Sequence, residues 1–158
     1  MGKEEKFAEL IERGGIFRNI TGKDPEEVLT ELIGGLPLFP SVPADTLLQS
    51  VLEREDLMPT GIGRGIAIPH PRNPILPPEI EPFTVLAYLE NPVDWSSLDG
   101  EKVDTLLLIV SATAKQHLVT LSEINFLCRQ KDFLNLLKER AGLDELLVLI
   151  REMEKQWR

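Results

Sequence analysis

A chain of 158 residues, 42% of them hydrophobic, is long enough to bury a core, and we expect residues 1–158 to form one domain. This apolar fraction is typical of a globular protein and argues against a disordered chain. The formal net charge of −9 argues against nucleic acid or anionic lipid as the main partner, because both bind to basic surfaces.

Helices are predicted for the first part of the chain. Residues 3–15 carry apolar side chains at helical spacing before a pair of glycines. In residues 24–34, Asp24 as the N-cap, a proline at the first helical position and Glu27 at capping-box spacing predict a second helix that ends at a glycine. After a proline-rich loop, residues 43–56 predict a long amphipathic helix. Its inward-facing side chains are expected to be Leu47, Leu48, Val51 and Leu52.

Strands are predicted after residue 60. Residues 65–68 and 83–90 are short apolar or alternating runs bounded by Gly, Pro and Asn. Residues 102–110 are nearly continuously apolar, which is typical of a strand buried on both faces. Amphipathic helices are predicted over residues 113–130 and 143–157. We therefore expect an α/β fold in which a small mixed β-sheet is sandwiched between α-helices.

We find no segment in the sequence that resembles a secretion signal or a membrane helix. The N-terminal stretch MGKEEKFAELIERGG is acidic and amphipathic, whereas a signal peptide has a basic end and an apolar centre. The apolar run TLLLIV is far shorter than the roughly 20 residues of a membrane helix. The single cysteine, Cys128, excludes an internal disulfide and suits a reducing compartment. We therefore expect a cytoplasmic protein without membrane insertion.

One of the two histidines lies in a rigid frame. His70 stands between Pro69 and Pro71 at the end of MPTGIGRGIAIPHPR, residues 58–72. The prolines restrict the backbone, and the three preceding glycines allow turns that leave amides uncovered for an anion. The glycine spacing matches neither a P-loop nor a Rossmann fingerprint. From these residues alone, a histidine packed in a Gly/Pro-rich turn and a reacting histidine remain alternatives.

The second histidine is expected near a helix N-terminus. Thr113 and Gln116 have capping-box spacing, so a helix should begin at Thr113 and place His117 one turn inside it, on the inward face. Such an end favours anions. The strand over residues 103–110 would carry this helix start to the carboxyl edge of the sheet, where ligands of α/β folds bind. The alternative is a core histidine bonded to a local oxygen.

A candidate anion-binding arginine precedes the glycine loop. Arg54 lies at the end of a predicted helix, and its guanidinium can donate two parallel hydrogen bonds to a phosphate. The alternative is a solvated arginine paired with Glu53, Glu55 or Asp56.

Two other kinds of site are not supported by the residue spacings. The two histidines are 47 residues apart, and together with the lone cysteine they match no standard metal-ligand spacing, so we expect no metal. A serine hydrolase is not expected either, because the chain has no G-x-S-x-G motif.

The stretch LEREDLMPTGIGRGIAIPH closely resembles the signature of the enzyme IIA proteins of the bacterial phosphotransferase system, fructose/mannitol class, which includes a nitrogen-regulatory form. The segment NPVDWSSLDGEKVDTLLLIVSATAKQHLVTLSEI and the C-terminal LDELLVLI resemble the same family. The resemblance runs from about Lys3 to the end of the chain and is strongest over residues 51–70 and 91–125. It implies a mixed sheet sandwiched between helices.

The resemblance also implies a function. It assigns His70 as the phosphorylated residue, with His117 assisting and Arg54 close by. A phosphoryl group would come from a phosphohistidine carrier such as HPr or its nitrogen-branch analogue, so no metal or nucleotide cofactor is needed. The phosphorylation state would regulate partner proteins. The alternative is a sugar-specific IIA component that passes phosphate to a IIB cysteine.

Further contacts to the phosphate are expected from the loops around His70, and Thr60, Gly61 and Arg72 are the candidates. The family usually has a small residue, often glycine, after the histidine, whereas this chain has Pro71 and then Arg72. The proline-rich stretch RNPILPPEIEP that follows is also longer and stiffer than the family pattern. These departures bear on the choice of partner more than on the chemistry.

Overall fold

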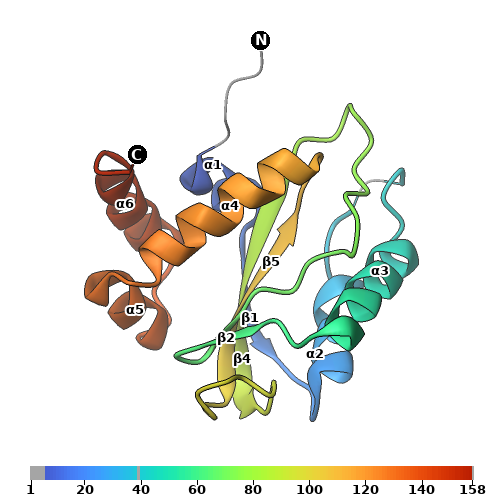
Figure 1. Cartoon of the computed structure of the whole chain (residues 1–158), viewed down its shortest axis with the longest axis horizontal. Coiled ribbons are helices and arrows are strands. Elements are labelled where there is room, and N and C mark those ends of the chain that lie inside the picture. Colours follow the sequence, from blue (N-terminus) through green and yellow to red (C-terminus); the bar gives the residue numbers. More distant parts are fainter. Residues whose placement is uncertain (1–5, 39, 158) are drawn as a thin grey trace.

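A five-stranded mixed sheet forms the centre of the molecule (Figure 1). The structure is a computed structural model that describes residues 6–38 and 40–157. The strands are β1 Ile16–Ile20, β2 Gly61–Gly63, β3 Ile66–Ala67, β4 Phe83–Val93 and β5 Val103–Val110. Their order in the sheet is β1-β4-β5-β3-β2. The pairs β1–β4 and β3–β5 are parallel, and the pairs β4–β5 and β2–β3 are antiparallel. The prediction of a mixed sheet is confirmed.

Helices cover both faces of this sheet. They are α1 Phe7–Gly14, α2 Pro25–Gly34, α3 Ala44–Leu57, α4 Ala114–Leu127, α5 Lys131–Lys138 and α6 Leu143–Glu154. Helices α2 and α3 lie on one face, whereas α1, α4, α5 and α6 lie on the other (Figure 1). In the described part of the chain, no helix is both long enough and apolar enough to cross a membrane. The predicted sandwich of helices around a small sheet is confirmed.

The two central strands are apolar on both faces because each face packs against helices. Along β4, Val85, Ala87 and Leu89 face α2 and α3, and Leu86 and Tyr88 face the opposite helices. The same alternation continues along β5, and this explains its nearly continuous apolar sequence. The prediction that this strand is buried on both faces is confirmed.

The predicted helix boundaries agree with the capping residues. The Asp24 side chain accepts a hydrogen bond from the Glu27 amide at 2.9 Å, as expected for the N-cap of α2. Thr113 does the same for Gln116 at the start of α4. The first predicted helix begins at Phe7, and residues 3–5 of that prediction lie outside the described residues.

Three short elements, β1, β2 and α5, were not predicted from the sequence. Strand β1 is half exposed, and its sequence IFRNI shows no clear alternation of apolar and polar residues. Asn19 in this strand has a positive φ. The parallel pairing with β4 defines the strand. Helix α5 has only eight residues and directly follows α4. Strand β2 begins and ends with glycine and turns into β3 through Gly63, Arg64 and Gly65, all with positive φ, where glycine relieves backbone strain.

The sheet topology brings two distant segments to one edge. Strands β3 and β5 are parallel neighbours, so the residues that follow both strands emerge on the same side. The amide of Ile109 donates to the carbonyl of Pro69 at 3.0 Å, which extends this pairing beyond the end of β3. The segments leading to His70 and His117 therefore meet at the carboxyl edge of β3 and β5.

Candidate functional site

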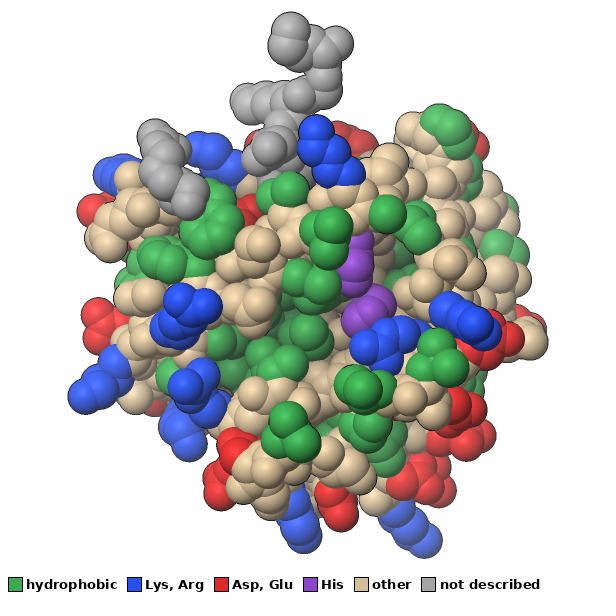
Figure 2. All heavy atoms as spheres, in the orientation of Figure 1, with side chains coloured by type: hydrophobic (Ala, Val, Ile, Leu, Met, Phe, Trp, Pro, Cys, Tyr) green, Lys and Arg blue, Asp and Glu red, His purple; other side chains and the backbone are tan. Residues whose placement is uncertain are grey.

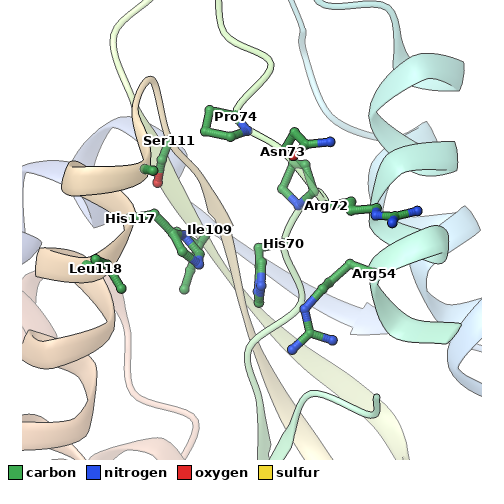
Figure 3. Close-up of a pocket in the computed structure, with 11 residues that line it drawn as sticks. Arg54, His70, Arg72, Asn73, Pro74, Ile109, Ser111, His117 and Leu118 are labelled. Carbon is green, nitrogen blue, oxygen red and sulfur yellow. The ribbon is translucent and has the colours of Figure 1, made fainter. Parts of the chain in front are cut away.

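A cavity of about 310 Å³ opens at this edge of the sheet between α3 and α4 (Figure 3). Its lining residues are Arg54, His70, Pro71, Arg72, Asn73, Pro74, Ile109, Ser111, Ala114, His117 and Leu118. None of these eleven residues is acidic, although the whole chain has a net charge of −9. Among the residues that the structure describes, the cavity wall thus combines two arginines and two histidines without a carboxylate, which favours an anionic ligand.

His70 lies at the centre of the cavity, with 9% of its surface exposed. Its Nδ1 atom is 2.8 Å from the carbonyl oxygen of Ile68. Because a carbonyl only accepts hydrogen bonds, Nδ1 carries the proton and Nε2 keeps its lone pair in the neutral ring. Burial lowers the pKa of His70, the bond to Ile68 opposes this shift, and the charge of Arg54 adds to it. His70 is therefore a neutral nucleophile at neutral pH.

His117 lies beside His70, with the two ring centroids 4.4 Å apart and the ring planes 48° apart. It occupies the first turn of α4, which the Thr113 cap fixes in place. Burial lowers the pKa of His117 to about 4, and the charges of His70 and Arg54 contribute to the shift. The position that the sequence predicted for His117, one turn inside a helix and turned inward, is the one that it occupies.

Arg54 reaches the cavity from the last turn of α3. Its Nη1 donates to the carbonyl oxygen of Met58 at 2.7 Å, which leaves further N–H groups for a ligand. Among residues 6–38 and 40–157, no carboxylate forms an ion pair with Arg54. Figure 3 shows that Arg54 and His117 flank His70 from opposite sides, so the three residues singled out in the sequence do come together.

The other three candidate residues lie differently. Thr60 is 4% exposed, and both its amide and its hydroxyl donate to Glu55 at 2.7 Å. Gly61 lies in β2 so close to Ser97 that a side chain at this position would collide with the serine hydroxyl. Neither Thr60 nor Gly61 lines the cavity. Arg72 does line it, but its side chain extends toward α3, away from the two imidazoles (Figure 3).

Several cavity residues were not singled out from the sequence. Ser111 follows β5 directly and is buried, and its place after a buried strand was an available signal. Leu118 follows His117 and is 64% exposed at the mouth of the cavity. Asn73 and Pro74 belong to the proline-rich stretch after His70. The sequence of this stretch has no pattern from which its path could be predicted. That stretch therefore shapes the wall of the cavity.

Comparison with known families gives one match that spans most of the chain. The family model described as "Phosphoenolpyruvate-dependent sugar phosphotransferase system, EIIA 2" matches residues 9–153. This range contains His70, His117 and Arg54.

Curated relatives fall into two functional groups. The chain is 28% identical over 152 residues to a nitrogen regulatory protein of Pseudomonas aeruginosa, with 94% of this chain and 97% of that protein covered. It is 34% identical over 140 residues to a nitrogen regulatory protein of Bradyrhizobium diazoefficiens, with 87% and 88% covered. It is also 28% identical over 153 residues to a fructose-specific EIIABC component of Bacillus subtilis, covering 95% of this chain but 24% of that longer protein.

Solved structures share the fold at lower identity. The crystal structure of the nitrogen regulatory protein IIA-Ntr from Neisseria meningitidis matches with a TM-score of 0.74 at 22% identity, covering 87% of this chain and 93% of that one. A complex of enzyme IIAMTL with phosphorylated enzyme IIBMTL from Escherichia coli matches with a TM-score of 0.68 at 19% identity, covering 88% and 95%. The five-stranded mixed sheet between helices is thus the fold of enzyme IIA structures.

Proposed function

Because the chain belongs to the EIIA 2 family of the phosphoenolpyruvate-dependent sugar phosphotransferase system, we propose that Nε2 of His70 accepts a phosphoryl group from a phosphohistidine carrier protein. The observation that carries this proposal is the state of His70, a buried neutral imidazole whose Nδ1 is committed to Ile68. The carrier would be HPr or its nitrogen-branch analogue.

The transfer step needs no cofactor. The lone pair of Nε2 attacks phosphorus in line, the phosphorus–nitrogen bond of the donor breaks, and its electron pair stays on the donor imidazole. Positive charge that develops on the His70 ring is stabilised through Nδ1–H by the carbonyl of Ile68. The remaining N–H groups of Arg54 are placed to offset the charge on the phosphoryl oxygens. Positioning and charge stabilisation account for the role of the protein.

His117 changes its protonation during this step in our proposal. It is neutral before transfer because burial and the neighbouring charges lower its pKa to about 4. A phosphoryl group on the adjacent ring brings about two negative charges, which raise the pKa of a histidine. We expect His117 to take up a proton and to donate a hydrogen bond to the phosphoryl group.

The surface around the cavity suits a protein donor. Three large apolar side chains are exposed here: Leu118 lines the cavity, Leu57 is the last residue of the helix that carries Arg54, and Met58 follows it. Figure 2 shows the two histidines in a hollow flanked by apolar side chains. Exposed apolar patches of this kind are typical of surfaces that bind other proteins. The cytoplasmic location expected from the sequence is part of this proposal.

We assign the chain a regulatory role, in which phosphorylation of His70 changes its affinity for target proteins. Similarity over nearly the full length to nitrogen regulatory proteins supports this role. The second candidate is a sugar-specific IIA component that passes phosphate to a IIB cysteine. The fructose-specific relative and the structure of a IIA–phosphorylated IIB complex favour that candidate.

The test is phosphorylation by purified carriers. The chain is incubated with labelled phosphoenolpyruvate, enzyme I and HPr, and acid-labile phosphohistidine is then mapped. We expect label on His70, complete loss of label in His70→Ala, and slower labelling of His70 in His117→Ala. Undiminished labelling of a folded His70→Ala variant, or label on His117, would contradict the proposal. Adding a IIB protein to the labelled chain then distinguishes the two roles, since only a sugar-specific component is expected to pass label to the IIB cysteine.

A further inference from the structure

Glu55 holds Thr60 with both of its carboxylate oxygens. Oε2 accepts from the Thr60 amide and Oε1 from the Thr60 hydroxyl, each at 2.7 Å. Hydrogen bonds to a charged acceptor are stronger than neutral ones, and two of them fix both the position and the orientation of the threonine. Thr60 is almost fully buried and Glu55 is half-buried, so these bonds are partly shielded from water.

These bonds continue toward the phosphorylation site. The carbonyl of Thr60 accepts from the amide of Ile68 at 3.0 Å. The carbonyl of the same Ile68 lies 2.8 Å from Nδ1 of His70. An uninterrupted series of hydrogen bonds therefore links the end of α3, across the β2–β3 hairpin, to the ring of His70.

We propose that Glu55 is a positioning residue for His70, a role that rests on the proposed function of that histidine. By holding Thr60, Glu55 fixes the Ile68 carbonyl, which keeps the proton of His70 on Nδ1 and presents the lone pair of Nε2 to the donor. Glu55 does not line the cavity, so it acts through the backbone rather than on the phosphate. Its neighbour Arg54 binds the carbonyl of Met58, so adjacent residues of α3 hold the same loop while only one of them faces the ligand.

The arrangement also explains why an acidic residue stands next to the anion site. A carboxylate that faced the cavity would repel a phosphoryl group. Both Glu55 oxygens accept hydrogen bonds from Thr60 instead. The charge of Glu55 thus strengthens the loop without entering the wall of the site.

The test compares Glu55→Ala and Glu55→Gln with Glu53→Ala as the matched control. Glu53 is an exposed residue on the same helix and does not line the cavity. Nitrogen NMR on the ¹⁵N-histidine-labelled chain reports which ring nitrogen of His70 carries the proton, and rapid-quench kinetics report transfer from phosphorylated HPr. The parent chain is expected to hold the proton on Nδ1.

In Glu55→Ala we expect a second His70 tautomer to appear and transfer to slow about tenfold, which is about 1.4 kcal/mol in the barrier. Glu55→Gln, whose amide oxygen can still accept from Thr60, should recover most of the rate. Glu53→Ala should match the parent chain and reports the effect of losing one negative charge. Thr60→Val should behave like a weaker Glu55→Ala, and Thr60→Ser should restore the parent tautomer.

A Glu55→Ala variant with the parent tautomer would overturn the inference, whether or not its transfer rate falls, since a slower rate alone would indicate a merely structural role. The tautomer is measured without phosphate. Failure of the parent chain to accept phosphate would therefore count against the proposed function, while the NMR comparison would still decide the role of Glu55.

Discussion

At the scale of single residues, the environment of each histidine determines what it can do. Both rings lie in a cavity to which the described part of the chain contributes no acidic residue, and burial favours their neutral forms. Ile68 selects the proton position on His70, while no carboxylate competes for Arg54 among the described residues. These features suit an imidazole that must be uncharged before it accepts a phosphoryl group and whose phosphoryl group must then be bound by hydrogen-bond donors.

The lowered pKa of His117 predicts a pH-dependent stability. In the unfolded chain His117 binds a proton near its ordinary pKa of 6.5, whereas the folded chain binds it only near pH 4. Between these values the unfolded state binds more protons, so the free energy of unfolding should decrease as the pH falls from about 6.5 to about 4. Urea unfolding at several pH values should show a smaller decrease for His117→Gln. An identical pH dependence in both proteins would contradict the assignment.

At the scale of elements, the ends of helices and strands build the site. Helix α3 contributes its last turn, helix α4 its first turn, and the parallel strands β3 and β5 their carboxyl ends. The cap at Thr113 is reinforced by Gln116, whose side chain accepts from the Ala112 amide at 2.9 Å. A displacement of the first turn of α4 would therefore move His117 relative to His70.

Two helix caps of the same kind allow this element-scale claim to be tested. Thr113→Ala and Asp24→Ala each remove an N-cap, and each should lower the free energy of unfolding by about 1 kcal/mol. Only the α4 cap supports a cavity residue, so only Thr113→Ala should slow phosphoryl transfer and shift the titration of His117. Chemical denaturation and histidine NMR measure the two effects. Equal transfer rates in both variants would argue against a role of the α4 N-terminus.

At the scale of the whole molecule, one sheet joins two apolar clusters. The cluster on the α2–α3 face contains Leu47 and Trp95, and the cluster on the opposite face contains Leu10. Trp157 packs against Phe126 of α4 with ring centroids 5.3 Å apart. Each face thus carries one of the two tryptophans of the chain, and the shared strands β4 and β5 should make the faces unfold together.

We therefore predict that damage to one face is detected by the tryptophan of the other. Leu47→Ala and Leu10→Ala should each lower the free energy of unfolding by about 2–5 kcal/mol. In each single-tryptophan background, Trp95→Phe or Trp157→Phe, the fluorescence of the remaining tryptophan and far-UV circular dichroism should give coincident urea midpoints for the same protein. Separate midpoints would show that the two faces unfold independently.

The long helices, the buried central strand and the candidate site residues could be predicted from local sequence. Capping residues such as Asp24 and Thr113 act within one turn of the chain, and the nearly continuous apolar sequence of β5 reflects its two covered faces. Both signals can therefore be recognised in the sequence of the element alone. Residue type and local frame singled out Arg54, His70 and His117 as candidates, whereas the choice between a packed and a reacting histidine came from the family resemblance.

Features that depend on pairing between distant segments could not be predicted from local sequence. Strand β1 exists through its parallel register with β4, and the approach of His117 to His70 depends on β3 lying beside β5. Thr60 was expected to contact the phosphate, but both of its donors bind Glu55 of α3. The sequence shows which side chains can donate or accept hydrogen bonds. Which partner each of them binds depends on the tertiary fold, which brings distant segments together.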